Sequence, residues 1–142
     1  MVDPSSKMVL VVEDSPTQAL QLQLLLEEEG LQVICAEDGE TGLALATQVY
    51  PDLIILDIQL PGIDGFQVCR CLKELPDVAD IPVIMFTRHD TPEAIMMGLE
   101  TGAIDYIPKD VFANAVLLET LRQMGLIPSH ALGDMGNIEV EL

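Results

Sequence analysis

Five short apolar runs, separated by longer amphipathic stretches, constrain the fold of this chain more than any other feature. The runs lie at residues 8–13, 31–35, 52–57, 82–87 and 104–107. They are rich in Val, Ile and Leu and lack apolar–polar alternation, which is typical of strands covered by helices on both faces. Strands that alternate with helices in this way predict an α/β domain with a parallel sheet.

Capping residues indicate where the intervening helices begin and end. Gly30 ends the first helix and Gly125 ends the last. We divide the chain into an N-terminal extension at 1–7, one domain at 8–125 and a C-terminal tail at 126–142, in which residues 138–142 alternate and could pair with a sheet edge. The residues expected to cap the helix N-termini are Ser15, Asp38, Asp64, Thr91 and Asp110.

Charge and hydropathy exclude several classes of function. The chain has 142 residues, with 24 acids against six Lys and Arg, so its net charge is −18. This charge repels nucleic-acid phosphates and anionic membrane surfaces, so we expect neither as a direct partner. The acidity favours solubility or, as the alternative, selects a basic partner. No signal peptide and no apolar run of about 20 residues is present, so we expect a soluble, cytoplasmic protein.

Carboxylates lie at the ends of two apolar runs. Glu13 and Asp14 end the first run, and Asp57 ends the third. Ligands of open α/β sheets bind at the carboxyl ends of the strands, where the strand order reverses, so these acids converge if the two strands are neighbours. Crowded carboxylates raise one another's pKa unless a cation lies among them. An all-oxygen set of this kind points to a hard metal ion.

Four segments resemble the receiver domain of two-component response regulators. They are VVEDS at 11–15, LIILDIQLPGIDGF at 53–66, VIMFT at 83–87 and GAIDYIPK at 102–109. The resemblance covers roughly residues 8–125 with all the spacings between the motifs. It implies a flavodoxin-like (βα)5 three-layer sandwich whose five-stranded parallel sheet has the order 2-1-3-4-5. Since seventeen residues follow 125, it suggests a stand-alone, chemotaxis-type receiver or one cut from a larger chain.

The resemblance also implies the roles of the strand-end residues. Asp57 is the implied phosphoacceptor, which forms an acyl phosphate. The implied ligands of a magnesium ion are the carboxylates of Glu13, Asp14 and Asp57 and the main-chain carbonyl of Gln59.

A second group of residues is implied to read the phosphoryl group. Lys109 and Thr87 are expected to contact its oxygens. Thr87 and Tyr106 form the implied switch, in which the threonine moves towards the phosphoryl group and the tyrosine ring turns into the vacated space. The surface formed by the fourth helix, fifth strand and fifth helix then changes. On that surface we expect Met97, Phe112 and Val116 to form a partner face.

Three positions depart from the usual receiver pattern, and the mildest departure is Glu13 in place of the commoner Asp. Arg88 follows Thr87, where receivers usually have a small residue. We hypothesise that Arg88 and Gln59 limit the access of water to the acyl phosphate, the alternative being a solvent-facing arginine. Lys109 is followed by Asp110 instead of the usual cis proline, and the sequence leaves open whether that peptide is cis or trans.

These features predict a signalling phosphoacceptor. We expect no enzymatic activity beyond self-catalysed phosphorylation and dephosphorylation at Asp57. The expected partners are a sensor histidine kinase or phosphotransfer protein and a downstream protein, with a homodimer through the partner face as an alternative. A pseudo-receiver that binds proteins without phosphotransfer is the competing hypothesis. A haloacid-dehalogenase-type hydrolase is disfavoured because Gln59 stands where that chemistry needs a second acid.

Overall fold

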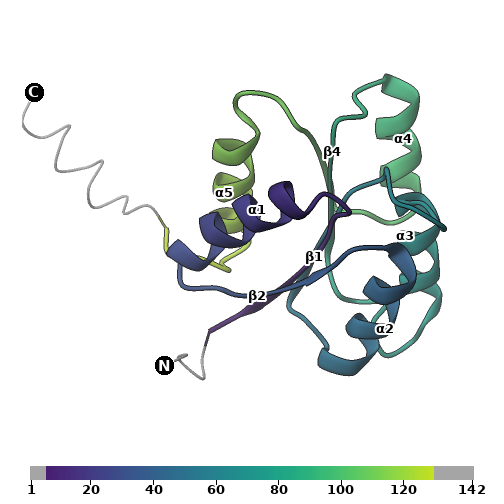
Figure 1. Cartoon of the computed structure of the whole chain (residues 1–142), viewed down its shortest axis with the longest axis horizontal. Helices are drawn as coiled ribbons and strands as arrows, with labels where there is room; N and C mark the ends of the chain where they lie inside the picture. Colours follow the sequence, from purple (N-terminus) through teal and green to yellow (C-terminus); the bar gives the residue numbers. More distant parts are fainter. Residues whose placement is uncertain (1–5, 130–142) are drawn as a thin grey trace, which may run out of the picture.

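The fold is a twisted five-stranded parallel sheet with helices on both of its faces (Figure 1). The computed structural model describes residues 6–129, so the alternating segment at 138–142 lies outside the described residues. The strands are β1 (Met8–Val12), β2 (Gln32–Ala36), β3 (Leu53–Leu56), β4 (Val83–Thr87) and β5 (Asp105–Pro108). The helices are α1 (Pro16–Glu28), α2 (Gly39–Val49), α3 (Gly65–Glu74), α4 (Pro92–Glu100) and α5 (Ala113–Gln123).

The strand order is β2-β1-β3-β4-β5, so the predicted flavodoxin-like topology is confirmed. The order reverses between β1 and β3, where Val12 is in register with Leu56. The Asp57 amide donates to the Val12 carbonyl over 3.0 Å, which extends this pairing by one residue. The register therefore brings the acids that follow β1 next to Asp57 at the carboxyl edge of the sheet.

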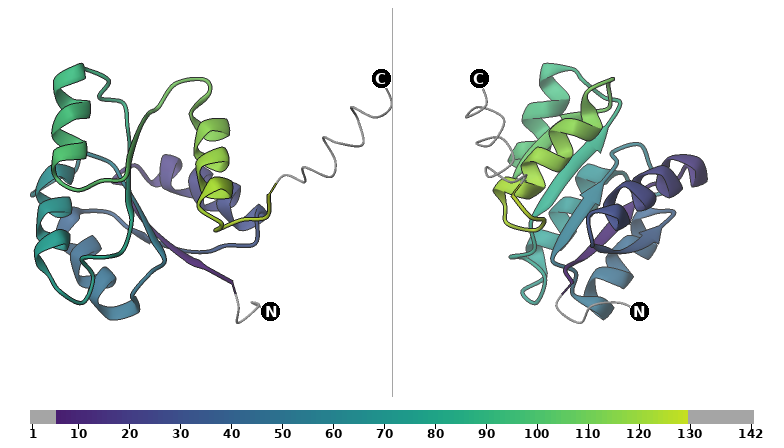
Figure 2. Two further views of the ribbon diagram at one scale, coloured as in Figure 1. Left: turned by 180° about the vertical axis from the view of Figure 1, so that it is seen from behind. Right: turned by 90° about the vertical axis from the view of Figure 1, so that its left-hand side faces the viewer.

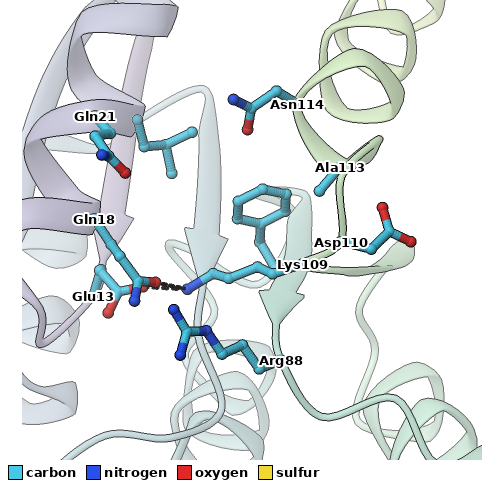
Figure 3. Close-up of a pocket in the computed structure, with 10 residues that line it drawn as sticks. Glu13, Gln18, Gln21, Arg88, Lys109, Asp110, Ala113 and Asn114 are labelled. Atoms are coloured by element: carbon cyan, nitrogen blue, oxygen red, sulfur yellow. Dashed lines mark hydrogen bonds and ion pairs between the residues drawn. The ribbon is translucent and has the colours of Figure 1, made fainter.

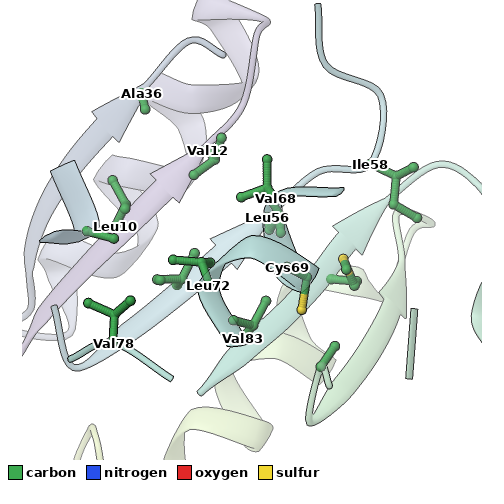
Figure 4. Packing of buried hydrophobic residues seen from close by; sticks show 14 of the residues in the cluster. Leu10, Val12, Ala36, Leu56, Ile58, Val68, Cys69, Leu72, Val78 and Val83 are labelled. Atoms are coloured by element: carbon green, nitrogen blue, oxygen red, sulfur yellow. The ribbon is translucent and has the colours of Figure 1, made fainter. Parts of the chain in front are cut away.

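Helices form the two outer layers of the sandwich. Two views of the molecule show α1 and α5 on one face of the sheet and α2, α3 and α4 on the other (Figure 2). Leu10 and Val12 of β1 pack into the cluster beneath α2, α3 and α4 (Figure 4), whereas Val9 and Val11 pack into the cluster beneath α1 and α5. Successive residues of a strand point to opposite faces, which explains why these runs are apolar throughout.

Four of the five predicted N-caps are confirmed. The side chains of Ser15, Asp38, Asp64 and Thr91 accept hydrogen bonds from the first turns of their helices. The prediction for Asp110 was wrong, because α5 begins after Phe112 and has no side-chain cap. Asp110 instead forms a turn before the helix, in which its carboxylate accepts a hydrogen bond from the Phe112 amide over 2.8 Å.

Two further features bear on the predictions from sequence. All peptide bonds of the described residues are trans, so the Lys109–Asp110 bond is trans. Among the helices within residues 6–129, none combines the length and the apolar character that crossing a bilayer requires.

Candidate functional site

The ammonium group of Lys109 joins two carboxylates and one amide at the carboxyl edge of the sheet. Lys109 Nζ lies 2.8 Å from Asp57 Oδ2, 2.5 Å from Glu13 Oε1 and 2.7 Å from Gln18 Oε1. Figure 3 shows the lysine side chain extending from the loop after β5 towards Glu13 and Gln18. Since an ammonium group has three N–H bonds, this arrangement engages all of its donors.

Strand ends position each member of this group. Glu13 directly follows β1, Asp57 follows β3, and Lys109 follows β5, while Gln18 lies in the first turn of α1. The Lys109 amide donates to the Thr87 carbonyl over 2.7 Å, which extends the β4–β5 pairing up to the lysine. A trans peptide after Lys109 is therefore compatible with a lysine directed at Asp57.

The charged groups are largely removed from water. Glu13 and Asp57 are each 6% exposed, and the side chain of Lys109 is 13% exposed. The Lys109 Nζ atom also lies 5.7 Å from the centre of the Phe86 ring, at the outer range of a cation–π contact. Solvent screens buried ion pairs only weakly. The charges of Lys109, Glu13 and Asp57 therefore dominate the electrostatic potential at this site.

The two carboxyl groups respond differently to burial. Burial alone would raise the pKa of Asp57, but hydrogen bonds and charge from Lys109, with further hydrogen bonds from the Gln59 amide and the Thr87 hydroxyl, hold it below its ordinary value. Burial raises the pKa of Glu13 despite its bonds to Lys109 and the Ser15 amide. Asp57 is therefore the carboxylate that stays ionised, and Glu13 is the one that is more easily protonated.

Thr87 and Tyr106 are buried residues that act on or respond to the charge of Asp57. Thr87 ends β4 and is fully buried, and its hydroxyl accepts a hydrogen bond from the His89 amide over 3.4 Å. The Tyr106 hydroxyl donates to the His89 carbonyl over 2.7 Å, and the tyrosine is 7% exposed. Burial, with the charges of Asp57 and Asp90, raises the pKa of Tyr106 to about 12. The tyrosine ring is thus directed inwards.

The other candidate residues are more accessible. Asp14 and Arg88 are exposed, as is Gln59, whose amide donates to Asp57 Oδ1 over 3.0 Å. The members of the expected partner face are all exposed, at 42% for Met97, 69% for Phe112 and 46% for Val116.

A cavity of about 220 Å³ lies between α1 and α5 beside the lysine (Figure 3). Arg88 and Lys109 both line it, and Figure 3 shows both side chains reaching towards Glu13 and Gln18. The rest of the lining consists of Gln21, Leu22, Phe86, Asp110, Ala113 and Asn114, besides Glu13 and Gln18.

Gln18 is the member of the site that sequence reasoning missed. Its only signal in the sequence is its place in the first turn of a helix that begins two residues after Asp14. Such a position lies at the carboxyl edge of the sheet, but nothing in the local pattern indicates a contact with a lysine 91 residues away.

The residues predicted to bind magnesium are all oxygen donors. The described residues contain no cluster of three or more His, Cys, Asp or Glu side chains placed to hold a metal ion. In this structure the cation between Glu13 and Asp57 is the Lys109 ammonium group. The ligands predicted from the sequence, which are the carboxylates of Glu13, Asp14 and Asp57 and the carbonyl of Gln59, offer oxygen atoms alone, the donors that magnesium prefers, and their use as ligands stays a prediction.

Comparison with known proteins identifies the class to which this fold and site belong. Residues 9–122 match the family model described as the response regulator receiver domain. The chain is 41% identical to protein PilH of Pseudomonas aeruginosa over 109 residues, which cover 77% of this chain and 90% of PilH. It is 42% identical to the response regulator PleD of Caulobacter vibrioides over 106 residues, which cover 75% of this chain but only 23% of PleD.

Solved structures of response regulators are also similar to this chain. Chemotaxis protein CheY4 of Vibrio cholerae matches with a TM-score of 0.77 and 29% identity, covering 84% of this chain and 98% of CheY4. A response regulator from Chloroflexus aurantiacus matches with a TM-score of 0.79 and 32% identity over the same shares. This chain belongs to the receiver-domain family of two-component response regulators, and it is similar to the chemotaxis-type receivers over most of their length.

Proposed function

We propose that this receiver accepts a phosphoryl group on Asp57 from the phosphohistidine of a sensor kinase or phosphotransfer protein. The observation that supports this best is the buried Asp57 carboxylate, which a lysine at 2.8 Å keeps ionised. In the transfer, an Asp57 oxygen forms a bond to phosphorus while the bond between phosphorus and the donor imidazole nitrogen breaks. The imidazole leaves with the electron pair. No base is needed, because the nucleophile is already an anion.

Lys109 supplies positive charge at the reacting centre. The phosphoryl oxygens carry more negative charge than the oxygens of the carboxylate alone. The Lys109 ammonium group therefore moves one of its three hydrogen bonds from the acceptor it now binds to a phosphoryl oxygen. The neutral amide of Gln18 is the acceptor that is least costly to give up. A magnesium ion held by Glu13, Asp14, Asp57 and the Gln59 carbonyl would neutralise further phosphoryl charge.

Thr87 and Tyr106, which are already buried, respond to the phosphoryl group. The Thr87 hydroxyl hydrogen-bonds to a phosphoryl oxygen, and the movement of Thr87 makes room for the Tyr106 ring. Tyr106 leaves its bond to the His89 carbonyl as it turns, so the loop that contains His89 changes with it. The face formed by α4, β5 and α5 thereby controls a downstream protein. We place this signalling in the cytoplasm.

One observation favours the competing function of a scaffold without phosphotransfer. All three N–H bonds of Lys109 are already engaged by Glu13, Gln18 and Asp57. If the two carboxylates hold the lysine too tightly to release it, the site is a structural ion pair and not a phosphoacceptor.

Labelling with acetyl phosphate separates the two functions. We expect the intact mass to increase by one phosphoryl group when magnesium is present and not when it is chelated. Asp57→Asn should abolish the increase, whereas Asp77→Asn, which changes an exposed aspartate in the turn after α3, should leave it unchanged. An unmodified wild-type mass in the presence of magnesium would favour the scaffold.

A further inference from the structure

Gln18 occupies a position in α1 at which a glutamine side chain usually serves the helix itself. Ser15 is the N-cap of α1, and its hydroxyl accepts a hydrogen bond from the Gln18 amide over 3.3 Å. Gln18 is the third residue of the helix, where a Gln or Glu side chain normally reaches back to the amide of the N-cap residue and completes a capping box. In α1 that Ser15 amide donates instead to Glu13 Oε2 over 3.0 Å. The side chain of Gln18 is therefore not needed for capping.

The helix α3 shows the usual role of a glutamine at this position. Its N-cap is Asp64, and Gln67 is its third residue, as Gln18 is in α1. Gln67 Oε1 accepts a hydrogen bond from the Asp64 amide over 3.0 Å, and Asp64 Oδ1 accepts one from the Gln67 amide over 2.9 Å. The two glutamines have the same local setting, so contacts with distant segments explain the different role of Gln18. Its Oε1 atom accepts a hydrogen bond from Lys109 Nζ over 2.7 Å, while Glu13 takes its place at the cap.

The three acceptors of the Lys109 ammonium group differ in how readily each can be given up. Glu13 and Asp57 are each 6% exposed, so a bond lost to either carboxylate would leave a buried negative charge without its partner. Gln18 offers a neutral carboxamide and is only partly buried. A hydrogen bond between an ammonium group and a carboxylate is stronger than one between an ammonium group and a neutral oxygen. The bond to Gln18 is therefore the weakest of the three.

The cavity beside Lys109 gives the Gln18 side chain room to turn away from the lysine. Gln18 lines this cavity together with Gln21 and Asn114, which are both exposed. Figure 3 shows Gln21 on the α1 side of the cavity and Asn114 on the α5 side. A carboxamide that enters this space keeps hydrogen-bond partners, either in water or on these two side chains. Its departure from Lys109 therefore leaves no buried polar group unpaired.

We propose that Gln18 is a positioning residue for phosphotransfer, whose carboxamide holds the third N–H bond of Lys109 before the transfer and yields it to a phosphoryl oxygen when Asp57 is phosphorylated. This inference rests on the proposed function and deepens it. It explains how a lysine whose N–H bonds are all engaged becomes available without losing its contact with Asp57 or Glu13. A carboxylate at position 18 would hold the ammonium group more tightly and would oppose its transfer to the phosphoryl group.

Labelling of the full chain with acetyl phosphate and magnesium, followed by intact mass, tests this exchange in two variants. Gln18→Glu should slow labelling about tenfold, because a third carboxylate binds the ammonium group more strongly than a carboxamide does. Gln18→Met, which removes the acceptor but keeps a side chain of similar length, should be labelled at least as fast as wild type.

Gln21 provides the matched controls. Gln21→Glu and Gln21→Met make the same two changes about one turn further along α1, on an exposed residue that lines the same cavity, and should alter the labelling rate less than about twofold. Slower labelling of Gln18→Met would mean that Gln18 only supports the fold of the site, and that result would overturn the proposal. Equal slowing by Gln18→Glu and Gln21→Glu would overturn it as well, because the rate would then respond only to added negative charge.

Urea unfolding of the unphosphorylated chain separates failure of this proposal from failure of the proposed function. Gln18→Met should lower the urea midpoint of the wild-type chain but not that of Lys109→Met, which lacks the ammonium group that Gln18 binds. An equal shift in the two backgrounds would contradict the proposal whatever the result of labelling. Coupled midpoints in a chain that takes up no phosphoryl group would instead refute the proposed function and would show that Gln18 only holds the lysine in place.

Discussion

Replacement of Lys109 by Met tests whether the buried charges behave as the structure indicates. Methionine keeps an apolar stem beside the Phe86 ring but removes the cation that Glu13 and Asp57 share. All three side chains are at most 13% exposed, so solvent screens the loss only weakly. Removing one partner of a buried ion pair costs about 3–5 kcal/mol, because the remaining charge is left without compensation.

The cost should depend on pH in a definite direction. The pKa of Asp57 is lowered in the folded protein, so its contribution to stability is present above the pKa of the unfolded chain and is lost as the pH falls. Without Lys109, burial raises the pKa of both carboxyl groups, and each can take up a proton in mildly acidic solution. The difference in the free energy of unfolding between wild type and variant should therefore be large near about pH 7.5 and smaller near about pH 5.

Urea unfolding followed by circular dichroism at the two pH values measures this difference. Lys7→Met, which changes an exposed lysine, is the matched control and should alter the free energy of unfolding by no more than about 0.5 kcal/mol. Adding Glu13→Gln to Lys109→Met should recover part of the loss, because one of the two buried charges is then absent. A cost below about 1 kcal/mol at the higher pH, or an equal cost at both, would refute this account of the site.

Three further predictions concern the surroundings of Asp57. Gly65→Ala should lower the free energy of unfolding by about 1–3 kcal/mol in the same urea assay, since the new methyl group would collide with the Asp57 carbonyl and lie 2.7 Å from Ile58 Cα, both of them backbone atoms. In a Tyr50→Phe background, Tyr106 is the only tyrosine and should ionise at about pH 12 by ultraviolet absorbance, because burial comes first among the causes that raise its pKa; ionisation near about pH 10 would contradict that placement. Arg88→Ala should speed loss of the phosphoryl group by opening the site to water, and an unchanged rate of dephosphorylation would show that this exposed arginine does not shield Asp57.

Much of the fold could be predicted because the residues within and next to each strand or helix indicate that element. The five apolar runs lie within about one residue of the observed strands, and four N-caps are hydrogen-bonded as expected. Short apolar strands and side-chain caps depend on neighbouring residues, so their signals survive without tertiary information. The strand order came from the resemblance to receivers and not from periodicity, because apolar runs do not say which strands are neighbours.

The remaining details depend on contacts between distant segments. Asp110 lies three residues before α5 and forms a turn there, because the chain must still travel from the end of β5 to the start of the helix. The bond between Gln18 and Lys109 joins α1 to the loop after β5 and has no local signature.

The proposed acyl phosphate at Asp57 can be located directly by borohydride reduction. After treatment with acetyl phosphate and magnesium, borohydride should convert the phosphorylated aspartate to homoserine, which peptide mass spectrometry assigns to a position in the chain. We predict homoserine at position 57 and at no other aspartate. Homoserine at Asp14 or another exposed acid, with Asp57 unmodified, would contradict the claim that the buried carboxylate beside Lys109 is the nucleophile.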